Sequence, residues 1–354
     1  MGDSTLCTGG KAMFLTIEDA VRRAREEVLV SLFTLADDWI GGRFIDALSE
    51  AARRGVRVQV IVDGYGSQRS CARVKKVLSA AGVSVSVFRP FQRWLLYHPL
   101  AALCRIHARV LIVDRALVGL GSIVFKNEFG DRADLFLLLE SAETDTIVEI
   151  FERFKMLATR RHRPALASTG RTIGNGLSLL VSGPDAESQE IHRWLLSACR
   201  SAGKRILIAT PIFFPTRELL SELRAAARRG VDVRIVTPLR IQRRHDILRA
   251  VPLPGLVAKS GVQWYGARTY FHSKFSIFDN RWTLGSANFD VISMKRNVEL
   301  NVWAEGGPLL GELETFFSVL ATSSSGIAAA DAWPIARVMA PLFYRTAEFL
   351  SSVS

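Results

Sequence analysis

An internal duplication constrains the fold of this chain more than any other feature of its sequence. The segment ALSEAARRGVRVQVIVD in the first half matches ELRAAARRGVDVRIVTP in the second, and Gly55 aligns with Gly230. An apolar, strand-like run precedes each copy: EVLVSLFTL in the first half and RILIATPIFF in the second. Self-similarity over so long a distance indicates two structural units of the same kind.

Both halves have the same order of expected elements: strand, helix, strand, helix, strand, a histidine-containing strand and a return strand. Strands that alternate with helices are typical of a parallel or mixed sheet covered by helices. The sequence therefore predicts an α/β protein of two tandem domains, each a mixed sheet flanked by helices. Two like domains commonly pack around a pseudo-two-fold axis, which would bring their equivalent positions face to face.

The repeat also sets the expected boundaries. We expect an N-terminal domain at 12–160, a linker at 161–175, a C-terminal domain at 176–320 and an amphipathic tail at 321–354. The junction falls in ATRRHRPALASTGRTIGNG, a stretch rich in Arg, Gly and Ser, as expected for a connection between domains.

Each half contains a polar cluster set into an apolar strand: IHARVLIVD in the first half and FHSKFSIFD in the second. Side chains alternate faces along a strand, so His107 and Arg109 share a face, as do His272 and Lys274. A single His on such a strand is more often a satisfied core residue than a catalytic one. Two at matching positions of a repeat, each followed by a cation, favour a functional site.

Two pairs of acids recur at fixed distances from these histidines. Asp114 and Asp279 lie seven residues after the histidine of their half, an odd spacing that turns them away, so we expect structural roles. Asp134 and Glu299 each lie 27 residues after it. A reactive histidine needs a carboxylate to fix its tautomer, and this shared offset selects Asp134 and Glu299 as the orienting acids.

Two imidazoles and two cations without a metal suit phosphoryl transfer through a covalent phosphohistidine. One imidazole attacks phosphorus, the other protonates the leaving alkoxide, and the cations hold the equatorial oxygens. Ser122, Ser286 and Asn288 follow glycine turns and are the candidate hydrogen-bond donors to those oxygens.

The net charge indicates which classes of partner the protein binds, and the cysteines indicate whether a structural metal or a disulfide is expected. Forty-six Lys and Arg against 34 Asp and Glu leave a formal net charge of +12, which favours nucleic acid or anionic lipid head groups. The four cysteines are scattered, so neither a structural metal nor a disulfide framework is expected. The sequence has neither an apolar window of about 20 residues nor a signal-peptide core, so we expect a protein kept on the cytosolic side.

The two clusters resemble the paired HxKxxxxD signatures of the phospholipase D superfamily. His272, Lys274 and Asp279 complete the second copy, whereas the first is a variant with Arg109 at the lysine position. Within the superfamily, ADDWIGGRFIDALSEAARRGVRVQVIVDGYGS and GSANFDVISMKRNVELNV are similar to B-type bacterial cardiolipin synthases. The resemblance covers most of the chain.

The resemblance implies two phospholipase D-like domains and a phosphatidyltransferase that makes cardiolipin and glycerol from two molecules of phosphatidylglycerol. It implies no metal or nucleotide cofactor. By analogy His107 is the nucleophile and His272 the general acid, then base, with the reverse order left open. The expected partners are anionic phosphatidylglycerol and the membrane surface, with a peripheral place on the cytoplasmic face of the bacterial inner membrane and no nucleic acid. The sequence gives no oligomeric state.

The first half departs from the family pattern. Arg109 keeps the positive charge of the usual lysine and can contact two phosphate oxygens, but with a planar geometry. Val124 occupies the place of a frequent Asn, for which Asn127 is a candidate substitute. These departures leave open a lipid-binding protein without activity. Two further alternatives are a phospholipase that uses water, since the acceptor cannot be read from the sequence, and a phospholipase D-like nuclease, since related nucleases share the His-Lys pair and a basic surface.

Two segments are candidates for contact with a lipid interface. FRPFQRWLLYHPLAALCR, residues 88–105, contains about fourteen residues more than the matching part of the second half. DAWPIARVMAPLFYRTAEFLSSV, residues 331–353, places apolar side chains along much of a short helix. Both combine aromatic and aliphatic residues with arginines, which is typical of interfacial segments, although packing on the core is the alternative for each.

Overall fold

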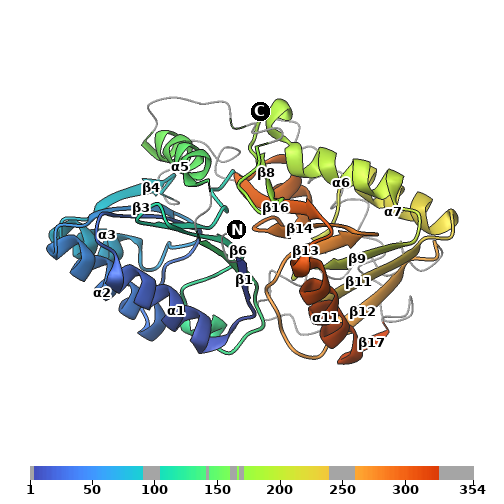
Figure 1. Ribbon diagram of the computed structural model, residues 1–354, viewed down its shortest axis with the longest axis horizontal. Helices are drawn as coiled ribbons and strands as arrows, with labels where there is room; N and C mark the ends of the chain where they lie inside the picture. Colours follow the sequence, from blue (N-terminus) through green and yellow to red (C-terminus); the bar gives the residue numbers. More distant parts are fainter. Residues whose placement is uncertain are drawn as a thin grey trace.

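The computed structural model describes residues 4–90, 104–140, 143–159, 166, 171–238 and 260–326. It contains two lobes that lie side by side, each built on a sheet with helices packed against it (Figure 1). Most of the expected interfacial loop, most of the expected linker and nearly all of the expected amphipathic tail fall outside the described residues. Among the helices of the described ranges, none has the length and hydropathy needed to cross a bilayer.

The first lobe contains a seven-stranded mixed sheet with the strand order β1-β7-β6-β5-β2-β3-β4. Strands β2, β3 and β4 run parallel to one another and the other neighbours pair antiparallel. Its elements are β1 (Ser4–Cys7), α1 (Gly10–Arg23), β2 (Glu27–Leu32), α2 (Trp39–Arg53), β3 (Arg57–Asp63), α3 (Cys71–Ala80), β4 (Ser84–Phe88), β5 (Val110–Val113), β6 (Leu117–Gly121), the 3-10 turn η2 (Asn127–Phe129), β7 (Phe136–Glu140) and α5 (Thr144–Thr159).

The second lobe contains an eight-stranded sheet with the order β17-β12-β11-β9-β13-β14-β16-β8, together with a small pair, β10 and β15. Its elements are β8 (Ser178–Ser182), η3 (Ala186–Ser188), α6 (Glu190–Ser201), β9 (Arg205–Ala209), β10 (Phe213–Phe214), α7 (Arg217–Arg228), β11 (Asp232–Pro238), β12 (Gln263–Ala267), β13 (Phe275–Phe278), β14 (Arg281–Gly285), β15 (Phe289–Asp290), α10 (Val291–Lys295), β16 (Glu299–Glu305), α11 (Pro308–Thr322) and β17 (Ser324–Gly326).

The two sheets have the same topology, which confirms the predicted pair of mixed sheets. Strands β8, β9, β11, β12, β13, β14 and β16 take the places of β1 to β7 in order, and β17 is added at one edge. The aligned glycines show why the repeat is visible in the sequence. Gly55 and Gly230 follow α2 and α7 with φ of 92° and 90°, a left-handed conformation that favours glycine. Each therefore ends a helix and starts the turn into a buried strand.

The lobes share one apolar core across their contact. Leu120 and Leu137 of the first sheet belong to the same buried cluster as Leu284 and Leu300 of the second. Two isolated bridges also join the lobes: Ile106 pairs with Val298, and Ala133 pairs with Phe271. These bridges fix the segments that enter β5 and β13 at the join between the lobes.

Candidate active site

Both predicted histidines lie at the join between the lobes, in extended segments that lead into β5 and β13. They therefore precede the strands in which the sequence placed them. The His107 backbone N–H donates to the carbonyl of Val298 at 2.8 Å, and the His272 N–H donates to the carbonyl of Ala133 at 2.9 Å. Each histidine thus forms its main-chain bond with the segment that carries the acid of the opposite lobe.

The pairing of histidines with acids crosses between the lobes. His107 Nδ1 lies 2.9 and 3.0 Å from the two carboxylate oxygens of Glu299. His272 Nδ1 lies 3.3 Å from Asp134 Oδ2 and 3.0 Å from the carbonyl oxygen of Ser122. A carboxylate or carbonyl oxygen accepts a hydrogen bond, so Nδ1 of each neutral ring carries the hydrogen and Nε2 carries the lone pair. The shared spacing selected both acids, but it did not reveal that each serves the other half.

Serine hydroxyls secure both acids. Ser122 donates to Asp134 and Ser286 donates to Glu299, so in this structure these hydroxyls bond carboxylates. Burial raises the pKa of each acid, but the bonds from the facing histidine and serine outweigh it and hold the pKa of Asp134 and Glu299 below its usual range. Both carboxylates are therefore ionised at neutral pH. A phosphate contact for the two serines stays a prediction.

The two predicted cations are buried beside the histidine rings. Lys274 Nζ lies 3.1 Å from His272 Nε2 and donates to the His272 carbonyl at 2.6 Å. Arg109 reaches His107 in the same way, with Nη2 3.0 Å from Nε2 and Nη1 donating to the carbonyl at 2.8 Å. Arg109 Nε is buried without a hydrogen-bond partner among the described residues. This guanidinium therefore retains a donor for an anion at the join.

Burial controls the protonation of the centre. Desolvation, with the charge of Arg109 added, lowers the pKa of His107 to about 4. Desolvation and then the charge of Lys274 lower the pKa of His272 to about 3. Desolvation also lowers the pKa of Arg109 to about 10 and brings that of Lys274 well below its ordinary value. At neutral pH both imidazoles are therefore neutral and hold an unprotonated nitrogen.

The remaining candidate donors have different surroundings. Asn288 is buried, and its Oδ1 has no hydrogen-bond partner within the described ranges. Its amide is thus a buried polar group that a ligand could satisfy. Val124 is buried among apolar residues of the first lobe. The Oδ1 of Asn127 accepts from the Ile40 N–H at 2.8 Å, so this amide is bonded to α2.

The aspartates of the two motifs bond the backbone instead of the histidines. The Asp114 carboxylate accepts from the N–H groups of residues 25–27 at 2.8 to 3.0 Å. Asp279 accepts in the same way from residues 203–205 at 2.8 to 2.9 Å. Each therefore joins the turn after a histidine-bearing segment to the start of the neighbouring strand.

Two residues near the first histidine escaped the sequence analysis. Asn297 Oδ1 accepts from the Arg105 N–H and its Nδ2 donates to Glu299 Oε1, both at 3.2 Å. The buried Asp63 accepts from the Ile106 N–H at 3.1 Å, and desolvation raises its pKa to about 6. Asn297 could have been noticed two residues before the selected acid. Asp63 ends the repeated segment but aligns with a proline, so the repeat gave no signal for it.

Aromatic rings from the first lobe pack edge-on against both imidazoles. The Phe33 ring lies 4.7 Å from that of His107, between ring centroids. The Phe129 ring lies 4.9 Å from that of His272 in the same manner. The guanidinium carbon of Arg132 lies over the Phe129 ring, 4.2 Å from its centroid. Only the tertiary fold brings these rings to the site, so no sequence spacing could have indicated them.

Most of the chain matches one protein family. Residues 17–155 and 195–320 match the family described as cardiolipin synthase, PLD-like domain. The chain belongs to this family and is, by homology, a cardiolipin synthase-like phosphatidyltransferase of the phospholipase D superfamily.

The curated relatives carry matching names. Cardiolipin synthase B from Shigella flexneri is 29% identical over 354 residues, covering 95% of this chain and 83% of the relative. Cardiolipin synthase B from Escherichia coli (strain K12) has the same identity and coverage. Cardiolipin synthase from Halalkalibacterium halodurans is 28% identical over 317 residues, covering 85% of this chain and 62% of the relative.

Two solved structures share the fold at low identity. Phosphatidylserine synthase from Haemophilus influenzae Rd KW20 superposes with a TM-score of 0.78 and 13% identity, covering 99% of this chain and 95% of that one. Polyphosphate kinase from Porphyromonas gingivalis superposes with a TM-score of 0.64 and 15% identity, covering 99% of this chain and 54% of that one. Together with the family match, the superposition on phosphatidylserine synthase confirms the predicted fold of two phospholipase D-like domains.

Proposed function

We propose that this protein makes cardiolipin by transferring the phosphatidyl group of one phosphatidylglycerol to a glycerol hydroxyl of a second, with release of glycerol. The main support for this proposal is that each histidine at the join pairs with the acid of the opposite lobe. Each imidazole has its Nδ1 on a carboxylate of the opposite lobe and a cation beside its Nε2. Two such imidazoles can serve one phosphorus atom from opposite sides, as a double displacement requires.

The first step forms a covalent intermediate. His107 Nε2 donates its lone pair to the phosphorus of phosphatidylglycerol, and the bond from phosphorus to the glycerol oxygen breaks. Protonated His272 gives its proton to that oxygen, so glycerol leaves neutral. The anionic phosphodiester raises the pKa of His272, so its Nε2 takes up a proton from solvent when the substrate binds. Glu299 stabilises the positive charge that develops on the His107 ring.

The second step returns the enzyme to its initial state. His272, now neutral, takes the proton from a glycerol hydroxyl of a second phosphatidylglycerol. The resulting oxygen attacks phosphorus, the bond from phosphorus to His107 Nε2 breaks, and the electron pair returns to the imidazole. The sum is two phosphatidylglycerol molecules in, and one cardiolipin and one glycerol out. Water in place of the second lipid would give phosphatidic acid.

The two cations stabilise charge on the phosphoryl oxygens. Arg109 lies beside His107 Nε2, the nitrogen that attacks phosphorus, and Lys274 lies beside His272 Nε2, the nitrogen that transfers the proton. An equatorial oxygen of the transition state would lie within reach of both cations. The unpartnered Nε of Arg109 supplies a further buried donor, whereas the unpartnered Oδ1 of Asn288 is an acceptor that suits the hydroxyl of an alcohol. Fixed charges and dipoles are worth more in a buried setting than in water.

The remaining finer assignments rest on charge and homology. The net charge of +12 and the names of the curated relatives support anionic phosphatidylglycerol as substrate. We infer a peripheral location on the cytoplasmic face of the bacterial inner membrane. In this account the protein binds the membrane surface and has no nucleic-acid partner.

Purified full-length protein with phosphatidylglycerol vesicles tests the function. Mass spectrometry of the lipids should show cardiolipin, and an enzymatic assay should show one glycerol released per cardiolipin. His272→Asn should abolish both products, whereas the surface control Asn280→Ala should not change them. Phosphatidic acid without cardiolipin would replace the proposal with a hydrolase. Cleavage of DNA without lipid turnover would reject both enzymes.

A further inference from the structure

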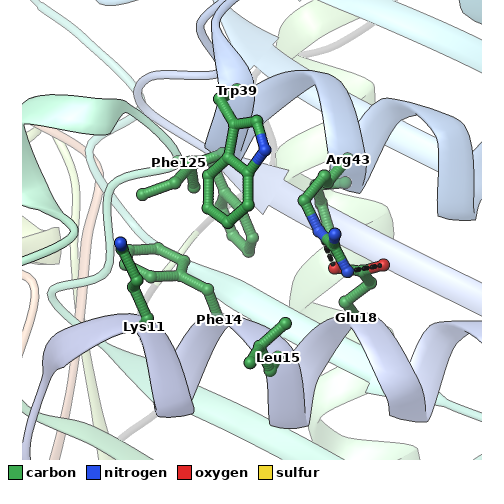
Figure 2. A pocket seen from close by; sticks show the side chains of 9 residues that line it. Lys11, Phe14, Leu15, Glu18, Trp39, Arg43 and Phe125 are labelled. Carbon is green, nitrogen blue, oxygen red and sulfur yellow. Dashed lines mark hydrogen bonds and ion pairs between the residues drawn. The ribbon is translucent and has the colours of Figure 1, made fainter.

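A groove between α1 and α2 presents aromatic residues at the surface, outside the histidine site. Phe125 stacks on Phe44 with their centroids 3.9 Å apart and meets Phe14 edge-on at 5.5 Å, and Trp39 stands at the rim of this aromatic floor (Figure 2). Trp39 is 52% exposed and Leu15, on the facing helix, is 46% exposed. Two large apolar side chains exposed at one place are typical of a surface that binds a partner.

The charges around this groove select the kind of partner. Lys11 Nζ lies 5.7 Å and Arg43 Cζ 5.2 Å from the centroid of the Trp39 ring, one cation on each side (Figure 2). Glu18 accepts two hydrogen bonds from Arg43, at 2.8 and 2.9 Å, and one from Arg22, which also pairs with Glu50. The two carboxylates together offset the charges of the two arginines. Lys11 has no ion pair within the described part of the chain. The rim therefore combines an indole, an aliphatic side chain and one uncompensated positive charge.

This combination fits the headgroup region of an anionic bilayer. Indole rings favour the boundary between water and hydrocarbon because one part of the ring is apolar and the N–H is polar. Lysine and arginine can lay their methylene stems on apolar surface while their charges stay with the headgroups. A negatively charged membrane surface attracts a nearby unpaired lysine.

The groove is bonded directly to the loop that covers the second imidazole. Asp38 caps α2, accepting from the Gly41 N–H at 3.1 Å, and it also accepts from the Asn127 N–H at 2.8 Å. Asn127 begins η2, and its side chain accepts in turn from the first turn of α2. Phe129, the last residue of η2, packs on His272. The first turn of α2, which carries Trp39, is thus fixed to the wall of the histidine site.

We propose that the face formed by Lys11, Leu15, Trp39 and Arg43 docks this protein on an anionic phospholipid bilayer. Trp39 and Leu15 enter the interface, and Lys11 and Arg43 remain among the headgroups. Because η2 connects this face to His272, docking places the histidine site next to the lipids. The inference rests on the proposed function only for the identity of the substrate lipid, since docking itself requires no turnover.

Vesicle binding of the full-length protein tests the docking face. With mixed phosphatidylcholine–phosphatidylglycerol vesicles, Trp39→Ala and Leu15→Ser should each weaken co-sedimentation by about tenfold, since each removes an apolar side chain from the interface. Lys11→Gln should weaken it by about fivefold, with no effect on vesicles of phosphatidylcholine alone. The matched control is Val319→Ser on α11, where the parent side chain is 61% exposed, and it should bind as the wild type does.

Brominated lipids report direct contact. The chain has seven tryptophans, so the difference between wild type and Trp39→Phe isolates the signal of this one indole. We expect the wild type to show fluorescence quenching by brominated phosphatidylglycerol vesicles that the variant lacks. Equal quenching in both proteins, together with unchanged binding of Trp39→Ala, would overturn the proposal. A change of oligomeric state with unchanged vesicle binding would assign the face to contact between copies of the chain and would also overturn it.

Turnover measurements separate this proposal from the proposed function. Trp39→Ala should unfold at the wild-type temperature and retain wild-type activity on short-chain phosphatidylglycerol below its micelle concentration, while losing activity on vesicles. If the wild type turns over no lipid but Trp39→Ala still loses vesicle binding, the docking face stands and the function fails. If the wild type makes cardiolipin and Trp39→Ala binds vesicles normally, the docking face alone is wrong.

Discussion

Arg109 is the residue at which the two half-sites differ most in chemistry. Its guanidinium occupies the position relative to His107 that the Lys274 ammonium occupies relative to His272. It also extends across the join to the Ser286 carbonyl at 3.4 Å. A planar group with five donors can make these contacts and still offer Nε to a ligand, which an ammonium cannot.

Two substitutions of Arg109 should therefore separate the contribution of its positive charge to catalysis from the contribution of its planar shape. Arg109→Met should lower kcat by about 10²- to 10³-fold, the effect of losing a donor to a developing oxyanion. Arg109→Lys keeps the charge and should retain more activity than Arg109→Met. Steady-state kinetics on phosphatidylglycerol would measure both. Equal activity of Arg109→Met and wild type would remove this residue from the mechanism.

Asn297 is expected to position His107 through two bonds. Asn297→Ala removes one of the bonds that hold the Glu299 carboxylate and the bond that holds the Arg105 N–H, so the imidazole is oriented less firmly. We expect kcat to fall by about 100-fold with little change in KM, because misplacement of a reacting group by about 1 Å has an effect of this size. The control is Asn280→Ala, which removes a surface bond to Glu305 and should have no such effect. A change in KM alone would assign Asn297 to substrate binding.

At this scale the sequence could select residues but not their partners. The two histidines, the two cations and the two acids followed from repeat arithmetic, because equivalent positions of a duplicated fold occupy equivalent places. The contact of His107 with Glu299 of the opposite lobe could not be predicted from the repeat, because spacing within one half says nothing about contacts between halves. Phe33 and Asp63 lie at strand ends where no repeated pattern marks them.

At the scale of elements, the motif aspartates hold the central strands of each sheet together. Asp114 follows β5 and accepts three N–H groups at the start of β2, the strand that β5 pairs with. Asp279 does the same for β13 and β9. Both have positive φ, 49° and 57°, a conformation that aspartate tolerates better than most residues. The backbone bonds compensate for that conformation.

Loss of either carboxylate should destabilise its lobe while leaving the chemistry intact. Asp114→Ala and Asp279→Ala should each lower the free energy of unfolding by about 2 kcal/mol or more, since hydrogen bonds to a charged group contribute about 1.5–3 kcal/mol each. Urea denaturation would measure this, with the exposed Asp145→Ala as control. At low temperature kcat should change less than twofold. A hundredfold fall in kcat with normal stability would contradict a structural role.

Most of the sheet architecture could be predicted from the repeat, and the exceptions have physical reasons. Strand β1 lies before residue 12, the expected start of the first domain, and was not predicted. Its alternating pattern is short and weak, and only its pairing with β7 identifies it as a strand. Strand β17 falls within the stretch assigned to the tail and extends the second sheet beside β12. The segments that carry the histidines leave the ladder of their own sheet to bridge the lobes, which no local pattern indicates.

At the scale of the whole molecule, the join buries two neutral imidazoles, and this burial predicts the pH dependence of stability. The folded pKa values of His107 and His272 are about 4 and about 3, below the ordinary 6.5. Between pH 6.5 and the folded pKa values, these two histidines therefore bind more protons in the unfolded chain than in the folded protein. Stability is complete above pH 6.5 and is lost as the pH falls toward the folded pKa values.

A double variant tests this linkage. Between pH 6.5 and 5 the wild type should lose about 3 kcal/mol more unfolding free energy than His107→Asn/His272→Asn, since each depressed histidine contributes about 1.4 kcal/mol per pH unit once the unfolded form is protonated. Urea titrations at each pH would measure it. His192, which is also buried with a lowered pKa, is present in both proteins and cancels in the difference. Parallel pH profiles would show that the imidazoles are not held neutral.

Isolation of the covalent intermediate tests directly whether the two lobes act on one phosphorus atom. Wild-type protein mixed with phosphatidylglycerol and quenched in alkali, under which phosphohistidine survives, should carry one phosphatidyl group per chain. Peptide mass spectrometry should place that group on His107, and His107→Asn should carry none. A label on His272 alone would reverse the assigned order of the two histidines. A label on each half, or none during active turnover, would contradict a single centre in which the two lobes act on one phosphorus atom.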